Sequence, residues 1–128
     1  MAAEFTLGKE ERLKSSATIQ NLLKKGETVS EYPFKLYWSI SDPQQKYPAR
    51  LAISVPKRKF KRAVDRNLIK RRIKESYRQN KSIIYDPLRE KNTNIVMIIL
   101  FLSDEFISFD SLDAGILKLL RKLANHLP

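Results

Sequence analysis

One segment, residues 57–81, carries most of the positive charge of the chain and also has the pattern of a helix. It holds twelve Lys or Arg residues and two acidic residues, whereas the rest of the 128-residue chain is close to neutral. Residues 63–80 include no Gly or Pro, and Ile69, Ile73 and Tyr77 follow one another at four-residue spacing. This pattern predicts a helix over 63–80 whose narrow apolar stripe packs on a core while a basic face stays outside.

Helical spacing and strand alternation predict the other elements. We expect a helix over 16–25, a strand over 28–40 interrupted near Pro33, a strand over 47–55, a strand over 94–102 and a final helix capped by Ser108. The strand over 94–102 is almost wholly apolar, which predicts burial on both of its faces. Along the first strand, Phe34, Leu36, Trp38 and Ile40 should face the core, with Lys35 and Tyr37 on the opposite face.

Turn signals predict how these elements are joined. The polar turn over 41–46 is short, so the strands on either side of it should pair as an antiparallel hairpin. Asp86-Pro87 predicts a turn or loop, and residues 1–14 are expected to be irregular or loosely attached. The fold class is α+β in the order α-β-β-α-β-α, and the first strand can count as two segments. The length predicts one domain over 1–128, with 1–8 loosely ordered.

Composition excludes several classes of function. The chain has no Cys and one His, His126, so thiolate metal sites, disulfides and cysteine nucleophiles are ruled out. We find no catalytic triad, Gly-rich phosphate loop or metal-binding cluster, and expect no catalytic or metal-ligating residue. The N-terminal sequence lacks the pattern of a signal peptide, and the longest apolar run is too short to span a bilayer. We therefore expect a cytoplasmic protein with no membrane partner.

The basic helix is the candidate binding surface. Five of its polar residues recur at spacings that place them on one face: Asn67, Lys70, Arg71, Lys74 and Arg78. The like charges on such a face repel one another and destabilise an isolated helix. A polyphosphate bound against the face would offset this repulsion. A solvated basic face without a ligand, a membrane-surface helix and a DNA-binding helix are the alternatives, and the upstream strands do not fit a helix-turn-helix motif.

Residues 66–75, RNLIKRRIKE, resemble the Arg-Asn-x-x-Lys-Arg signature helix of the bacterial ribonuclease P protein subunit. The surrounding RLAISVPKRKFKRAVDRNLIKRRIKESYR is similar to that family's strand, basic loop and helix, and the resemblance extends over about residues 9–126. It implies an α-β-β-β-α-β-α sandwich with a left-handed β-α-β crossover, a sense that general rules disfavour.

The resemblance also implies a function and partners. Members of this family bind a large catalytic RNA and the 5′ leader of precursor tRNA, and the RNA with bound Mg²⁺ removes the leader to give the mature 5′ end. The chain would then be a monomer in a 1:1 protein–RNA complex, the accessory subunit of an endoribonuclease, with no cofactor bound by the protein alone. The alternative is a noncatalytic, ribosome-associated protein that binds structured RNA.

Two sets of residues follow from the resemblance. The set expected to bind the RNA subunit is Lys57, Arg58, Arg62, Arg66, Asn67, Lys70, Arg71, Lys74 and Arg78. The set expected to bind the precursor leader is Ile19, Leu23, Lys35, Tyr37 and Arg50.

The chain departs from the family pattern at three places. Ile19 and Leu23 stand where aromatic residues are frequent, which removes base stacking by that helix and leaves Tyr37 as the stacking candidate. Pro56 replaces a usual Ser. The turn over 59–62 lacks the family's Gly and is one residue longer.

Overall fold

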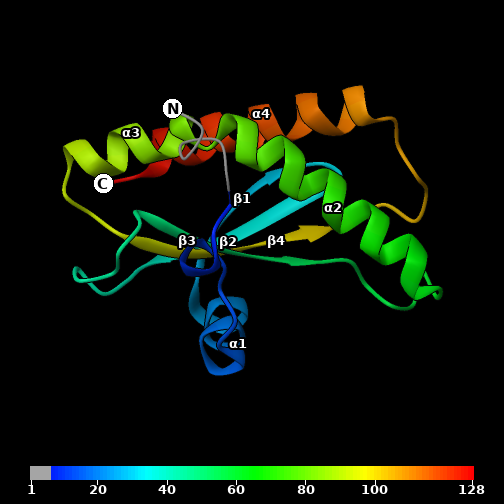
Figure 1. The fold of residues 1–128 in the computed structure, drawn as a ribbon, viewed down its shortest axis with the longest axis horizontal. Helices are drawn as coiled ribbons and strands as arrows, with labels where there is room; N and C mark the ends of the chain where they lie inside the picture. Colours follow the sequence, from blue (N-terminus) through cyan, green and yellow to red (C-terminus); the bar gives the residue numbers. More distant parts are fainter. Residues whose placement is uncertain (1–6) are drawn as a thin grey trace.

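The computed structural model describes residues 7–128, which form a four-stranded sheet with helices on both faces (Figure 1). The elements in chain order are η2 (Lys9–Glu11), α1 (Ser16–Lys25), β1 (Glu27–Glu31), β2 (Phe34–Ile40), β3 (Ala49–Ser54), α2 (Ala63–Asn80), α3 (Ser82–Glu90), β4 (Ile95–Phe101) and α4 (Phe109–His126). Helices α2, α3 and α4 cover one face, here called the inner face, and α1 lies on the outer face. The fold is the predicted α+β class.

The strand order in the sheet is β1-β2-β4-β3. The segment predicted as one interrupted strand is a hairpin of β1 and β2, which turns at Tyr32-Pro33. The predicted hairpin between the strands over 28–40 and 47–55 is wrong, because β4 lies between β2 and β3 and pairs with both. The apolar β4 has both faces buried, and a central position also satisfies the backbone groups along both of its edges.

Strands β3 and β4 are neighbours and run parallel, and α2 and α3 connect them. This is the β-α-β crossover implied by the resemblance. The connection starts at the carboxyl end of β3, so α2 begins beside the end of the sheet where Ser54, Leu100 and Lys35 lie in adjacent strands.

The helix over 16–25, the helix over 63–80 and the final helix are confirmed. Ser15 accepts a hydrogen bond from the backbone N–H of Thr18, and Ser108 accepts one from Ser111, as expected of N-caps. Gly26 ends α1 with an ordinary negative φ. A side chain is excluded there by close approach, since a Cβ atom would lie 2.6 Å from the carbonyl oxygen of Leu22.

The predicted loop at Asp86-Pro87 is wrong, because both residues lie inside α3. A proline within a helix costs about 3 kcal/mol. This helix also buries Ile84, Tyr85 and Leu88, and each large apolar side chain contributes about 1.5–3 kcal/mol on burial, so packing outweighs the proline. The helix ends where Asn92 adopts a positive φ of 53° and the N–H of Thr93 bonds to the carbonyl of Leu88.

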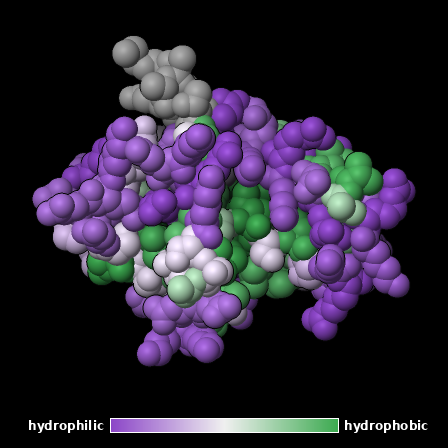
Figure 2. All heavy atoms as spheres, turned by 60° about the horizontal axis from the view of Figure 1, so that its bottom comes forward, coloured by the Kyte–Doolittle hydropathy of each residue, from purple (hydrophilic) through white to green (hydrophobic). Residues whose placement is uncertain are grey.

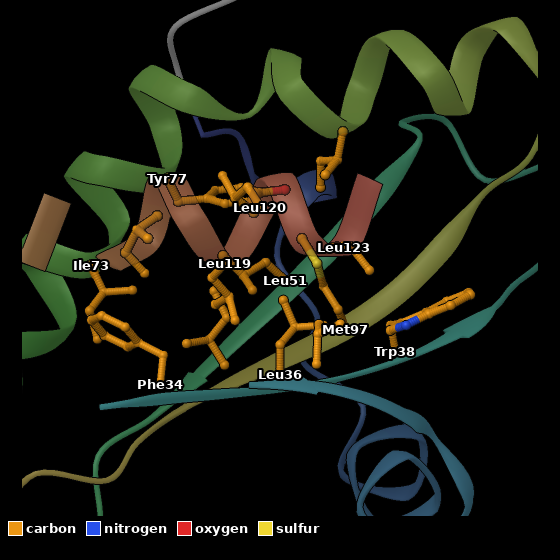
Figure 3. Close-up of a cluster of buried hydrophobic side chains, with 14 of the residues drawn as sticks. Phe34, Leu36, Trp38, Leu51, Ile73, Tyr77, Met97, Leu119, Leu120 and Leu123 are labelled. Carbon is orange, nitrogen blue, oxygen red and sulfur yellow. The ribbon is translucent and has the colours of Figure 1, made fainter. Parts of the chain in front are cut away.

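The main core lies between the inner face and the helices (Figure 3). Phe34, Leu36 and Trp38 are buried there as predicted, opposite Ile73 and Tyr77 of α2 and the leucines of α4. Ile40 differs from the prediction: it is 61% exposed, because it lies at the end of β2 beyond the covering helices.

The first described residues are not loosely attached, contrary to the prediction for residues 1–14. Glu11 and Leu13 are buried, and the N–H of Leu13 donates to the carbonyl of Leu51. Arg12 forms an isolated parallel bridge with Leu51, so this segment runs along the free edge of β3. Part of the range predicted to be loosely ordered, residues 1–6, lies outside the described residues.

Candidate nucleic-acid interface

The basic turn over 56–62 is anchored at its centre and exposed around it. Phe60 is buried against Phe101 and Phe106, with ring centroids 6.0 and 5.2 Å away. Lys59 donates to the carbonyl of Leu102, and Arg66 donates to the carbonyls of Phe60 and Lys61 at 2.8 and 2.9 Å. These contacts fix the turn without a glycine, and they leave the side chains of Lys57, Arg58, Lys61 and Arg62 exposed.

Helix α2 continues the basic surface away from this turn. Asn67 and Arg71 are exposed, and Lys70 and Lys74 are partly buried. The apolar stripe of Ile69, Ile73 and Tyr77 is buried on the other side, which orients the predicted basic face outward. Two members of the predicted set meet carboxylates of α2: Arg78 Nε donates to Glu75 at 3.1 Å, and Arg62 Nε lies 3.9 Å from Asp65.

The charge environment of Lys74 brings a residue outside both predicted sets into the surface. Burial lowers the pKa of Lys74, and the nearby positive charges of Arg12 and Lys70 lower the pKa further. Arg12 is exposed and lies on the segment along the edge of β3. Three cations from two distant parts of the chain therefore share one region, as expected of a surface that meets an anion.

The outer face has a small apolar cluster beneath α1. Leu13 and Leu22 are buried there against Val96 and Ile98 of β4, and Ile19, Tyr37, Ala52 and Leu100 pack around them, partly buried. Lys35 lies over the ring of Tyr37, with its Nζ 5.1 Å from the ring centroid. From the side of α1 the surface is mostly hydrophilic, with apolar side chains showing between the charged ones (Figure 2).

The predicted leader set is only partly brought together. Ile19 and Tyr37 pack against the same cluster, and Lys35 adjoins Tyr37. Leu23 is 43% exposed and lies outside that cluster. Arg50 is on the same face but two strands away from Tyr37, and its Nη2 donates to the carbonyl oxygen of Arg12 at 3.4 Å.

Two other features are absent from residues 7–128. That part of the chain holds no group of three or more His, Cys, Asp or Glu side chains that could bind a metal ion. It also has no helix whose length and apolar character would let it cross a membrane. Asp113 of α4 accepts a hydrogen bond from Ser76 of α2 at 2.6 Å, which gives it a structural role between the two helices.

A family model described as Ribonuclease P matches residues 7–124, nearly the whole described chain. The chain belongs to the ribonuclease P protein family. The ribonuclease P protein component of Porphyromonas gingivalis is 30% identical over 126 residues, which are 98% of this chain and 92% of that protein. That of Petrotoga mobilis is 33% identical over 125 residues, covering 92% of this chain and 95% of its own.

Solved structures of the ribonuclease P protein family share this fold. The Staphylococcus aureus RNase P protein superposes with a TM-score of 0.71 at 26% identity, covering 88% of this chain and 94% of its own. The Thermotoga maritima protein has a TM-score of 0.70, with 88% and 96% coverage, and at 22% identity it supports the fold alone. The family gives this chain its coarse role: a protein component of an endoribonuclease in tRNA processing, with an RNA partner.

The sequence does not predict where residues 9–14 lie, along the free edge of β3 between α2 and the outer face. The resemblance includes Arg12 in the stretch RLKSSATIQNLLKKGETV, but Arg12 is in neither predicted set of site residues. Its place depends on Glu11, whose side chain meets Lys81, 70 positions later in the chain. The available signal was weak: an acidic residue followed by Arg and Leu just before a helix.

Proposed function

We propose that this chain is the accessory subunit of ribonuclease P: it binds the catalytic RNA and the 5′ leader of precursor tRNA, and assists the endonucleolytic removal of the leader. The observation that carries the proposal is the basic surface of the anchored turn and α2, which follows the end of the sheet where Lys35 lies beside Tyr37. We also propose a 1:1 complex in the cytoplasm.

The basic surface would act by neutralising phosphates. Arg71 and Asn67 are exposed on α2, and a guanidinium offers forked donors to a phosphate while an amide can donate to and accept from a base or a 2′-hydroxyl. The anchored turn would present Lys57, Arg58 and Arg62 in a fixed arrangement, so that little order has to be created on binding.

The outer face would hold single-stranded RNA in a different way. The ring of Tyr37 can stack on a base, and Lys35 beside it can contact the adjoining phosphate. Ile19 would give apolar contact on the α1 side. We place Leu23 and Arg50 at the margins of this site, because one lies outside the cluster and the other is engaged with Arg12.

The chemistry would belong to the RNA. Mg²⁺ in the holoenzyme would be held by RNA phosphates, since the described residues offer no cluster of acidic ligands. The protein's contribution would be to orient the substrate and reduce phosphate repulsion, which lowers the Mg²⁺ concentration that the reaction needs.

Reconstitution tests this proposal. The cognate RNA should cleave precursor tRNA faster with the protein than without it at low Mg²⁺, and the protein alone should be inert. Lys70→Ala should reduce this enhancement much more than Lys118→Ala, which removes the same charge from an exposed position on α4. A folded protein that leaves the rate of its cognate RNA unchanged would refute the proposal.

Co-purification separates the ribosome-associated alternative. An accessory subunit should recover one dominant large noncoding RNA together with precursor tRNAs. Recovery of ribosomal RNA without any effect on precursor cleavage would favour the alternative instead.

A further inference from the structure

Residues 9–14, here called the linking segment, connect the two surfaces proposed to bind RNA. At one end Glu11 reaches the junction of α2 and α3, where Lys81 lies. At the other end Leu13 is buried with Leu22 beneath α1. Between them Arg12 pairs with Leu51 at the free edge of β3, so the segment passes from the α2 side of the molecule to the α1 side.

Glu11 is held by a buried polar cluster, here called the Glu11 cluster, made of Glu11, Lys81 and Tyr85. The side chains of Glu11 and Lys81 are 2% and 5% exposed, and Lys81 Nζ lies 2.6 Å from Glu11 Oε2. The hydroxyl of Tyr85 donates to the same carboxylate oxygen, and the backbone N–H of Gly8 donates to the other at 3.0 Å. Both oxygens therefore have donors from different parts of the chain.

A buried ion pair is a costly way to stabilise a fold, because apolar side chains of the same volume often do so equally well. What the Glu11 cluster adds is a unique alignment, because a shift of the linking segment by one residue would break the buried contact between Glu11 and Lys81. The alignment matters for the next residue, since Arg12 is exposed while its backbone is fixed by the bridge to Leu51 and by Arg50.

The position of Arg12 joins the two surfaces. Its charge lies close enough to Lys74 on α2 to lower the pKa of that lysine. The next residue, Leu13, is already part of the apolar cluster of the outer face. A strand of RNA that passed from α2 to the outer face along this edge would meet the guanidinium of Arg12 on its way.

We propose that Arg12 is a further RNA-phosphate contact that joins the α2 surface to the outer face, and that Glu11, Lys81 and Tyr85 are positioning residues that hold it there. This inference rests on the proposed function, because it takes RNA as the partner. The phosphate belongs either to the catalytic RNA or to the precursor leader, and the experiment distinguishes these two sources.

The test of Arg12 uses Arg12→Gln in the full chain, with Arg121→Gln on the exposed side of α4 as a control that removes the same charge. Binding is measured against salt for the RNA subunit alone, and for the holoenzyme with precursor tRNA that carries or lacks a leader. Loss of one phosphate contact should reduce the slope of log affinity against log salt by about 1. Arg121→Gln should leave the slope unchanged.

The binding measurement in which Arg12→Gln changes the salt slope identifies which RNA supplies the phosphate. A smaller slope with the RNA subunit assigns the contact to the catalytic RNA, and a change confined to precursor with a leader assigns it to the leader. Unchanged slopes in every arm, or an equal change in Arg121→Gln, would overturn the role of Arg12.

The positioning role is tested by double-mutant cycles that combine Arg12→Gln with Tyr85→Phe or with Glu11→Gln. Tyr85→Phe keeps the ring and the Glu11–Lys81 pair. If the Glu11 cluster acts through Arg12, then Arg12→Gln should have a smaller effect in either background than in the parent chain. Urea unfolding verifies that each variant is folded. A full Arg12 effect in both folded backgrounds would show that the cluster is only structural, and would overturn the positioning role.

Failure of this inference differs from failure of the proposed function. If the unsubstituted protein does not accelerate its cognate RNA, the proposed function is wrong. If it does so while Arg12→Gln behaves like the parent chain, only the inference about Arg12 is wrong.

Discussion

At the scale of single residues, several charged side chains hold the structure together as well as offering charge to RNA. Arg66 is the clearest case: it belongs to the signature helix, but its guanidinium donates to the carbonyls of Phe60 and Lys61. Asn67, the next residue, is exposed and free to face a ligand. The two neighbours should therefore respond differently to substitution.

Arg66→Ala should lower both the stability and the RNA affinity of the protein, because two backbone carbonyls lose a charged donor and the basic turn loses its anchor. We expect the free energy of unfolding to fall by about 1–3 kcal/mol. Asn67→Ala should weaken RNA binding while leaving the unfolding free energy within about 0.5 kcal/mol of the parent. Urea unfolding and a binding titration measure the two effects, and equal stability of the two variants would contradict the anchoring role of Arg66.

Glu11 should make the stability depend on pH. Burial alone would raise the pKa of its carboxyl, but hydrogen bonds from Lys81, Tyr85 and Gly8 and the charge of Lys81 together hold the pKa below its usual value of 4.5. A lowered pKa stabilises the fold at pH values above the usual one, and this stabilisation is lost as the pH falls through the lowered value.

Glu11→Gln should therefore be less stable than the parent by about 3–5 kcal/mol at pH 7, because the buried ion pair between Glu11 and Lys81 is broken. Unfolding measured across a pH series should show this difference in unfolding free energy narrowing as the pH falls from 4.5 through the lowered pKa, where the parent's own carboxyl becomes protonated. If the difference in unfolding free energy stayed constant down to the lowest pH at which the protein folds, it would contradict a contribution from the ion pair.

At the scale of elements, the boundaries of α1, α2 and α4 follow from local signals, whereas strand pairing does not. Ser15 and Ser108 mark helix starts, and the four-residue stripe of α2 is visible in the sequence. The neighbours of β3 were misassigned because the short turn after β2 favours a hairpin locally. The neighbour of β3 is instead β4, whose residues lie 46 positions further along the chain, as in the pair Ala49 and Ile95.

Gly115→Ala tests how closely α4 packs on the sheet. Alanine favours an isolated helix over glycine by about 1 kcal/mol, but a Cβ atom here would lie 2.8 Å from the ring of Phe34. That ring is fully buried and packs on Phe101, so it has little room to move. We expect a net loss of about 1–3 kcal/mol in thermal or urea unfolding, and a more stable variant would show that the ring can shift.

At the scale of the whole molecule, the net charge of +11 is concentrated on one side, around the basic turn and α2, on a scaffold that is otherwise close to neutral. This asymmetry would steer an RNA to one side of the protein and make its affinity depend strongly on salt. Arg66 and Arg78 are already engaged with protein groups, so fewer cations are available than the composition suggests.

Affinity for the cognate RNA should fall steeply with salt, with a slope of about −4 to −7 on a log–log plot, as expected if five to eight phosphates are neutralised. The Lys118→Ala control on α4 should keep the same slope, and Lys70→Ala should reduce it by about 1. A slope near zero would mean that the basic surface does not face phosphates.

The sequence by itself determined the α+β class, the helices α1, α2 and α4, the burial of both faces of β4, and the basic face of α2. Each of these depends on residues within one or two turns of a helix or along one strand. The signature helix also carried the family. The tertiary structure decided which strands are neighbours, that α3 forms despite Pro87, and that Arg50 lies two strands away from Tyr37. It also decided the place of Arg12, because the contact between Glu11 and Lys81 joins residues 70 positions apart and only the closed fold brings them together.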